Sequence, residues 1–210
     1  MRHILGAYAR RVSSGLQIDE RNRLFVALEL PDDLREHAAV AASAISGYPE
    51  TRVVPAANLH VTLQFLGRIR PAQAPDLLAA LDDAFHGPVV RVRAGDVVPR
   101  PSPGRARLVA LGLEDVDGGL TILAKRIHRA IAIALGGTAS NGPVWPHITI
   151  ARFRRPERVR RSPTTRSERV FDIVRVALYD SDIAPGRSPK YHELLGTTLG
   201  TLAQRSSFHG

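Results

Sequence analysis

Cysteine is absent from this chain of 210 residues. Disulfide bonds, cysteine nucleophiles and thiolate metal sites are therefore excluded. No apolar run approaches the roughly 18 residues that a membrane-spanning helix needs. The sequence also lacks a Gly-x-x-x-x-Gly-Lys loop and a Gly-x-Ser-x-Gly turn. Neither nucleoside triphosphate binding nor a serine hydrolase of that type is therefore indicated.

Acidic residues are in deficit, with 20 against 29 lysines and arginines, and the formal net charge is +9. Excess positive charge favours a polyanionic partner, nucleic acid first. Base composition of a genome also enriches arginine, so charge alone leaves that question open. The 44% hydrophobic and 23% charged content is ordinary for a globular protein. The length suits one domain or two small lobes around a shared cleft.

Residues 1–22 contain no apolar core of the kind that a secretory signal carries, which spans about 7–15 residues. We interpret this segment as a flexible N-terminal extension and expect a cytoplasmic protein without a membrane partner. Residues 205–210 read as a polar tail.

Two short β-type runs organise the chain, Leu59–Leu63 (LHVTL) and Pro146–Ile150 (PHITI). Each carries a histidine and, two residues later, a threonine. Side chains at i and i+2 of a strand lie on one face, so each imidazole is expected beside a hydroxyl, with the apolar residues turned away. A lone His-x-Thr is common in strands. Two of them facing each other would supply two acid–base groups and two hydroxyl donors, which suits a phosphodiester.

The two runs occur in matching contexts, which favours function over core packing. The first set consists of Phe25–Leu28 (FVAL), an expected helix and then the first His strand. The second set consists of Leu108–Leu111 (LVAL), an expected helix and then the second His strand. The spacing from Val26 to His60 is 34 residues, and that from Val109 to the second histidine is 38. The chain therefore reads as a strand–helix–strand unit used twice.

The sequence resembles the two-histidine (2H) phosphoesterase superfamily, in its RNA 2′,3′-cyclic phosphodiesterase branch, also called 2′-5′ RNA ligase-like proteins. The matching segments are Arg23–Leu28 (RLFVAL), Asn58–Gly67 (NLHVTLQFLG) and Pro146–Arg152 (PHITIAR), with a weaker match in Tyr179–Tyr191. The resemblance spans roughly residues 23–202 and leaves the first 22 unmatched.

The resemblance implies an acid–base reaction that needs neither metal nor cofactor. His60 would protonate the departing 3′ oxygen of a 2′,3′-cyclic phosphate, and His147 would activate water. Thr62 and Thr149 would bind the non-bridging oxygens, and Arg152 would contribute to substrate binding. The product would be a 2′-phosphate end, and the reverse reaction would join RNA weakly through a 2′-5′ linkage.

Strand alternation adds three expectations about individual side chains. Arg152 is five residues after His147, so strict alternation turns it to the opposite face. Either a bulge or the end of the strand re-aims it, or it packs or binds RNA away from the phosphorus. For Phe65 and Trp145 we expect a core position rather than a role in stacking on a nucleobase.

The expected fold is α+β and bilobal, with two antiparallel sheets, helices outside and the histidines in a central cleft. Residues 23–204 would form this two-lobed domain. Strands are predicted at 24–30, 59–66, 108–113, 170–179 and 191–202, and helices at about 31–45, 71–85 and 120–135. Residues 152–169 hold eight arginines and are predicted to be a basic loop that contacts RNA.

RNA is the expected partner, and the protein is expected to be a monomer. Two other hypotheses remain. As a second option the site could serve 2′-5′-linked oligonucleotides or a small cyclic nucleotide; substrate length would distinguish these, and the basic loops favour RNA ends. A non-catalytic RNA-binding module would need positive charge but not two titratable imidazoles.

Overall fold

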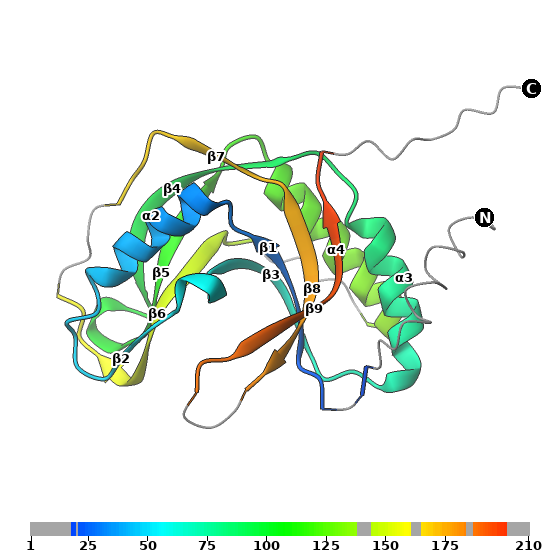
Figure 1. The fold of residues 1–210 in the computed structure, drawn as a ribbon, viewed down its shortest axis with the longest axis horizontal. Helices are drawn as coiled ribbons and strands as arrows, with labels where there is room; N and C mark the ends of the chain where they lie inside the picture. Colours follow the sequence, from blue (N-terminus) through cyan, green and yellow to red (C-terminus); the bar gives the residue numbers. More distant parts are fainter. Residues whose placement is uncertain (1–17, 20, 138–143, 161–164, 184–186, 201–210) are drawn as a thin grey trace, which may run out of the picture.

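A computed structural model of the chain describes residues 18–19, 21–137, 144–160, 165–183 and 187–200 (Figure 1). These form three α-helices: α2 (Asp32–Ser43), α3 (Ala74–Ala84) and α4 (Gly119–Leu135). The strands are β1 (Leu24–Glu29), β2 (Thr51–Val53), β3 (His60–Gly67), β4 (Val90–Arg100), β5 (Ala106–Asp115), β6 (His147–Glu157), β7 (Val170–Ile173), β8 (Arg175–Asp182) and β9 (Lys190–Thr198).

All of these strands belong to one antiparallel sheet of order β7-β4-β5-β6-β3-β1-β8-β9, with β2 added beside β6. In Figure 1 the sheet curls, with α2 on the left of the view beside β6 and with α3 and α4 packed side by side on the right, where α4 contacts β3, β4 and β5. The expected α+β class, the antiparallel pairing and the outer helices are confirmed.

The two expected sheets are the halves of this single sheet, and they meet at one residue pair. Val61 of β3 pairs with Ile148 of β6, and both side chains are fully buried. Beyond that pair β3 and β6 diverge, and β2 takes the place beside β6 with Arg52 opposite Arg152. One pair of residues therefore sets how the two halves approach each other.

The elements form for local reasons that the sequence carries. Leu24–Leu28 of β1 is buried on both faces, because Leu24, Val26 and Leu28 belong to the hydrophobic core while Phe25 packs against the rings on the other face. Asp32 and Asp33 occupy the first turn of α2, where acidic side chains complement the helix dipole. Helix α4 ends at Gly136, whose φ of 70° is the left-handed conformation that glycine adopts without steric cost.

Two expectations about the second half were wrong. The basic stretch after the second histidine is not all loop, because β6 continues to Glu157 and pairs with β2 and β5. The strand predicted at 170–179 is two strands, with exposed Val174 between them. Strand β7 pairs with β4 and β8 pairs with β1, so the chain crosses from one half to the other there.

The structure describes only a few residues of the predicted N-terminal extension. Ile18 is buried in the core, and Asn22 donates a hydrogen bond to the Asp180 carboxylate at 2.7 Å. Residues 1–17 and 20 of the N-terminal extension, and the tail at 205–210, lie outside the described residues. No helix among the described residues has the length and apolar character to span a membrane.

Candidate active site

The two His-x-Thr motifs lie side by side on one face of the sheet. His60 and His147 are the first residues of β3 and β6, and the next residue of each strand forms the buried pair that joins the halves. Since the strands are antiparallel, this register puts His60 next to Thr149 and Thr62 next to His147. Residues flanking a buried pair point to the other face. The structure therefore brings the four predicted side chains together.

His60 is fixed in one tautomer by a backbone carbonyl. Its Nδ1 lies 2.8 Å from the Asn58 oxygen and its Nε2 lies 3.0 Å from the Thr62 hydroxyl. A carbonyl oxygen only accepts, so Nδ1 carries the proton in the neutral ring. Nε2 is then the atom that faces the hydroxyl and takes up or releases a proton.

His147 repeats this arrangement. Its Nδ1 lies 2.8 Å from the carbonyl oxygen of Trp145, again two residues earlier. The proton is therefore on Nδ1, and Nε2 on the far edge of the ring is left for a substrate. Both imidazoles thus present the same nitrogen, which is the one that chemistry at a shared phosphorus would use.

Burial and neighbouring cations both favour neutral imidazoles in the empty site. Burial lowers the pKa of His60, its hydrogen bond to Asn58 opposes this, and the charges of Arg152 and His147 lower it further. Burial likewise lowers the pKa of His147, against the hydrogen bond to Trp145, with Arg100 and Arg152 adding to the decrease. A neutral imidazole is the form that can act as a base.

Arg152 reaches the site through a β-bulge. The pairing of β6 with β5 slips at Ile150, so that Ile150 and Ala151 are buried in succession. The extra residue inverts the alternation after it, as bulges beside active sites often do. Arg152 therefore lines a pocket with His60, and of the alternatives that the sequence left open the bulge is the one observed.

The expectation that Phe65 lies in the core was wrong for the same reason. The pairing of β3 with β1 slips at Leu63, and Phe65 is 66% exposed in the pocket that His60 lines. For Trp145 the expectation was wrong for a simpler reason. Its offset from His147 is two, which places both on one side, and the indole stacks on the imidazole.

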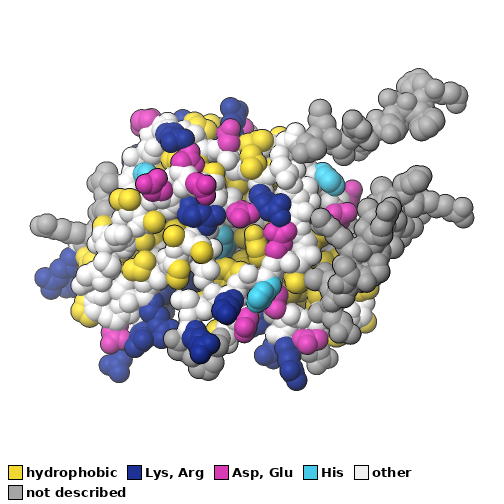
Figure 2. Space-filling model, in the orientation of Figure 1, with side chains coloured by type: hydrophobic (Ala, Val, Ile, Leu, Met, Phe, Trp, Pro, Cys, Tyr) yellow, Lys and Arg dark blue, Asp and Glu magenta, His cyan; other side chains and the backbone are white. Residues whose placement is uncertain are grey.

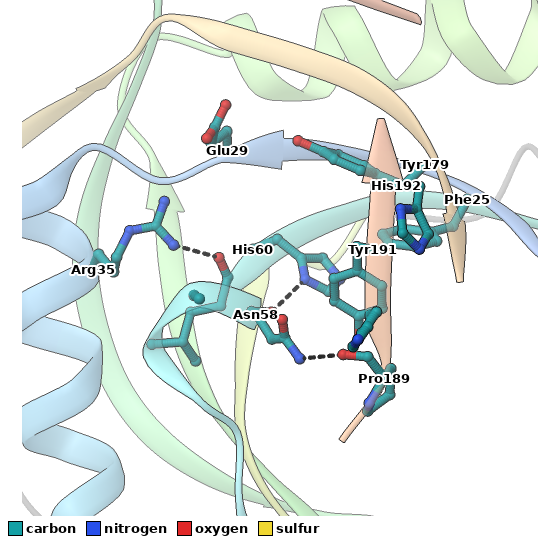
Figure 3. A pocket seen from close by; sticks show the side chains of 12 residues that line it. Phe25, Glu29, Arg35, Asn58, His60, Tyr179, Pro189, Tyr191 and His192 are labelled. Atoms are coloured by element: carbon teal, nitrogen blue, oxygen red, sulfur yellow. Dashed lines mark hydrogen bonds between the residues drawn. The ribbon is translucent and has the colours of Figure 1, made fainter. Parts of the chain in front are cut away.

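Two pockets of about 420 and 450 Å³ flank His60. They share Phe25, Pro189 and Tyr191 as walls, and Figure 3 shows the first of them with Tyr191 beside His60. The Phe25 ring is tilted against the imidazole at 5.1 Å between centroids, and the Tyr191 ring meets it edge-on at 5.4 Å. Aromatic walls of this kind can hold a nucleobase or ribose.

The aromatic walls come from β1, β8 and β9, and sequence reasoning assigned them no role. Tyr179 of β8 stacks on Phe25 at 5.4 Å. Burial, with the carboxylates of Glu29 and Glu193, raises the pKa of the Tyr179 hydroxyl to about 12, so it remains a hydrogen-bond donor. Phe25 lies in the matching segment Arg23–Leu28, and for Tyr179 and Tyr191 the weak match in the 179–191 segment was the sequence signal.

A polar network holds the loop before β3 in place (Figure 3). Arg35 of α2 donates to the carbonyl oxygens of Ala56 and Leu59 on either side of Asn58. The Asn58 side chain donates to the Pro189 carbonyl oxygen at 2.8 Å, next to Tyr191. One residue thus supports the histidine through its backbone and the aromatic wall through its side chain.

Comparison with known proteins places the chain in a family. The sequence model of the LigT-like phosphoesterase family matches residues 28–108. An Escherichia coli K12 protein named RNA 2′,3′-cyclic phosphodiesterase is 32% identical over 172 residues, which are 81% of this chain and 93% of that protein. The chain belongs to the two-histidine phosphoesterases, in their LigT-like branch. It is therefore a member of an enzyme family of hydrolases.

Further LigT-like phosphoesterases agree in sequence and fold. An Archaeoglobus fulgidus protein of the same name is 28% identical over 153 residues, or 73% of this chain and 79% of that one. The crystal structure of TT0787 of Thermus thermophilus superposes with a TM-score of 0.72 at 27% identity, covering 84% of this chain and 97% of that one. The likeness therefore extends over both halves of the sheet.

Proposed function

We propose that this LigT-like phosphoesterase hydrolyses RNA 2′,3′-cyclic phosphate ends to 2′-phosphate ends. The observation that carries the proposal is the paired arrangement of His60 and His147. Each has Nδ1 anchored on a carbonyl, and each lies beside the threonine of the other motif across the joining pair. The names of the relatives in Escherichia coli and Archaeoglobus fulgidus support the substrate.

In this mechanism His147 is the base and His60 the acid. The Nε2 atom of neutral His147 takes a proton from water, and the oxygen of that water forms a bond to phosphorus. The bond from phosphorus to the 3′ oxygen breaks, and protonated His60 gives its Nε2 proton to that oxygen. Each turnover leaves His147 protonated and His60 neutral, and exchange with solvent restores both. The assignment of the two roles follows the family resemblance.

Thr62, Thr149 and Arg152 stabilise the charge that develops on the non-bridging oxygens. Hydroxyl and guanidinium donors held in place before the reaction cost little reorganisation during it. The substrate also changes the acid itself. An anionic phosphate beside His60 favours the imidazolium, which counteracts the effect of burial on its pKa. The acid is thus charged mainly when a substrate is present.

The direct test is hydrolysis of an RNA oligonucleotide that ends in a 2′,3′-cyclic phosphate, in EDTA. Wild type is expected to yield the 2′-phosphate, and His60→Ala and His147→Ala are expected to lose at least about 100-fold in rate. The exposed His86 lies outside both pockets, so His86→Ala serves as the matched control. Turnover at the wild-type rate by both His60→Ala and His147→Ala would refute the assignment of the active site. A 3′-phosphate product would show that the 2′ oxygen, and not the 3′ oxygen, is the leaving group.

Other results of the same assay point to the other hypotheses. Turnover of 2′-5′-linked dinucleotides or mononucleoside cyclic phosphates, but not of the oligonucleotide, would assign a smaller substrate. Binding of RNA without turnover of any of these would indicate a binding module. Ligation is tested by incubating the 2′,3′-cyclic phosphate oligonucleotide with a second oligonucleotide that ends in a 5′-hydroxyl. A small amount of 2′-5′-linked product is expected.

A further inference from the structure

Three flat groups are stacked at the start of β6. The Trp145 indole lies parallel to the His147 imidazole, with 4.1 Å between ring centroids and 16° between planes. The guanidinium carbon of Arg100, from the end of β4, lies 4.1 Å from the centre of the same indole. Two groups cannot both be that close to one ring on one side. The indole is therefore covered by the imidazole on one face and by the guanidinium on the other.

Trp145 holds His147 in two independent ways. Its carbonyl oxygen accepts the Nδ1 proton, which fixes the tautomer and one point of the ring. Its side chain lies against the ring face, which restrains rotation of the ring plane about that point. A hydrogen bond to one nitrogen leaves that rotation free, so the indole supplies a restraint that the backbone does not.

Arg100 is available for this role because it has no acidic partner in the part of the chain that the structure describes. None of the ion pairs among the described residues includes it, although the side chain is exposed. A guanidinium over an indole is attracted to the ring, by about 0.5–1 kcal/mol at an exposed site. Stacked there, it keeps the indole against the imidazole rather than against solvent.

We propose that Trp145 is a positioning residue for His147, with Arg100 as the outer layer that keeps the indole in place. The proposal rests on the proposed function, in which His147 must aim Nε2 at water. It also means that Trp145, despite being partly exposed, is not a platform for a nucleobase, because both of its faces are already covered. The bases of the substrate must then stack elsewhere, on walls such as Phe25 and Tyr191.

The first test needs no substrate, because Trp145 is the only tryptophan in the chain. A protonated imidazole in contact with an indole quenches its fluorescence by accepting an electron, and a neutral one does so far less. Emission is expected to fall as the pH is lowered through the titration of His147, whose pKa is held below the ordinary histidine value of about 6.5 by burial and the nearby arginines. The transition should be absent in His147→Ala. A wild-type transition that persists in His147→Ala, or no transition at all, would overturn the stack.

Arg100 is tested by the same titration. The charged or titratable groups around the His147 ring are Arg100 on β4, Arg152 on β6 and His60 on β3. Removing a neighbouring cation favours the imidazolium, so Arg100→Met should move the fluorescence transition to higher pH. Arg100→Lys keeps the charge and should move it less.

The exposed Arg105 near the end of β4 provides the control, and Arg105→Met should leave the transition unchanged. A transition that is equally unaffected by Arg100→Met would remove Arg100 from the proposal.

The second test separates positioning from substrate binding. Trp145→Leu is expected to lower kcat by about 10- to 100-fold with KM changed by less than about threefold, because a misaimed catalytic group costs rate rather than affinity. Trp145→Phe, which still stacks, should recover most of that loss. A higher KM at unchanged kcat would instead make Trp145 a substrate contact and overturn the proposal. Inactivity of wild type on every cyclic phosphate would refute the proposed function, while the fluorescence titration would still report on the stack.

Discussion

At the scale of single residues, the two histidines share a hydrogen-bonding arrangement that the sequence motif does not reveal. Each imidazole donates from Nδ1 to the carbonyl oxygen two residues earlier, Asn58 for His60 and Trp145 for His147. The motif predicted that histidine and threonine share a face, which the structure shows for His60 and Thr62, while their part in the chemistry stays a prediction. It did not predict the tautomer, because that depends on the path of the loop that leads into each strand.

The lowered pKa of His60 leads to a pH dependence that differs between the free and the bound enzyme. An acid must be protonated, so kcat/KM, which reports the free enzyme, should fall as pH rises from below the ordinary histidine value of about 6.5. Bound phosphate favours the imidazolium, so the corresponding fall in kcat should come at higher pH. The check is the pH profile of both parameters on one cyclic phosphate. If kcat and kcat/KM fall over the same pH range, the expected effect of bound phosphate on the pKa of His60 is contradicted.

The Asn58 side chain should matter for substrate affinity more than for the acid itself. Asn58→Ala removes the donor to Pro189 and keeps the carbonyl that holds His60. We expect KM to rise by about three- to tenfold through a looser Tyr191 wall, and unfolding free energy to fall by about 1 kcal/mol. Asn22→Ala loses a comparable bond to Asp180 and should change stability alone. Equal effects of the two variants on KM would exclude the network as the cause.

At the scale of elements, two β-bulges decide which side chains reach the cleft. Strict alternation predicted the His/Thr faces correctly and then failed beyond Leu63 in β3 and Ile150 in β6. After the first bulge Phe65 lines the pocket, and after the second Arg152 does. A bulge depends on pairing with neighbouring strands and on what satisfies the extra residue, so the strand's own sequence does not specify it.

The bulge in β3 has an identifiable support in α4. His128 Nε2 lies 2.9 Å from the Leu63 carbonyl oxygen and donates to it, while its buried Nδ1 has no partner among the described residues. His128→Ala should lower the free energy of unfolding by about 2 kcal/mol, since a carbonyl loses its donor and a small cavity opens. Urea unfolding measures this. A loss below about 0.5 kcal/mol would mean that the bulge is held by the strands alone.

Strand β2 places two like charges opposite each other. Arg52 and Arg152 form a directly opposed cross-strand pair, and neither forms an ion pair among the described residues. Such pairs repel, so Arg52→Gln should raise stability by a few tenths of a kcal/mol. If an RNA phosphate normally relieves the repulsion, the variant should also bind oligonucleotide more weakly, with the salt slope of log K reduced by about 1. An unchanged slope would place Arg52 outside the RNA path.

At the scale of the whole molecule, the internal repeat predicted two similar units but not how they are joined. The joining pair, the place of β2 and the crossing at Val174 all come from pairing between distant segments, and hydrophobic pattern alone does not rank such pairings. The two His-x-Thr motifs come together because each lies at a strand start beside that joint, whereas Arg152 reaches the site through the bulge in β6. The division into residues 1–22, 23–204 and 205–210 stays a prediction.

The net charge of +9 bears on substrate length. Figure 2 shows basic side chains at several places on the visible face, among acidic ones. Contacts with several phosphates release counterions, so KM for an oligonucleotide should rise steeply between about 50 and 200 mM salt. KM for a mononucleoside cyclic phosphate should rise far less. Parallel salt dependence of the two would indicate that the enzyme contacts only the terminal nucleotide and would favour a small substrate.

The joint between the halves also separates two properties that an engineer would want to vary independently. The spacing of the acid and base follows from backbone pairing at Val61 and Ile148, whereas Tyr179 and Tyr191 in the pocket walls stand on β8 and β9. Exchanging wall side chains therefore leaves the backbone spacing of the two histidines untouched, while Tyr191 also packs edge-on against the His60 ring. The scaffold is in this sense modular, and its selectivity can be retuned by grafting new side chains onto β8 and β9 without rebuilding its reactive centre.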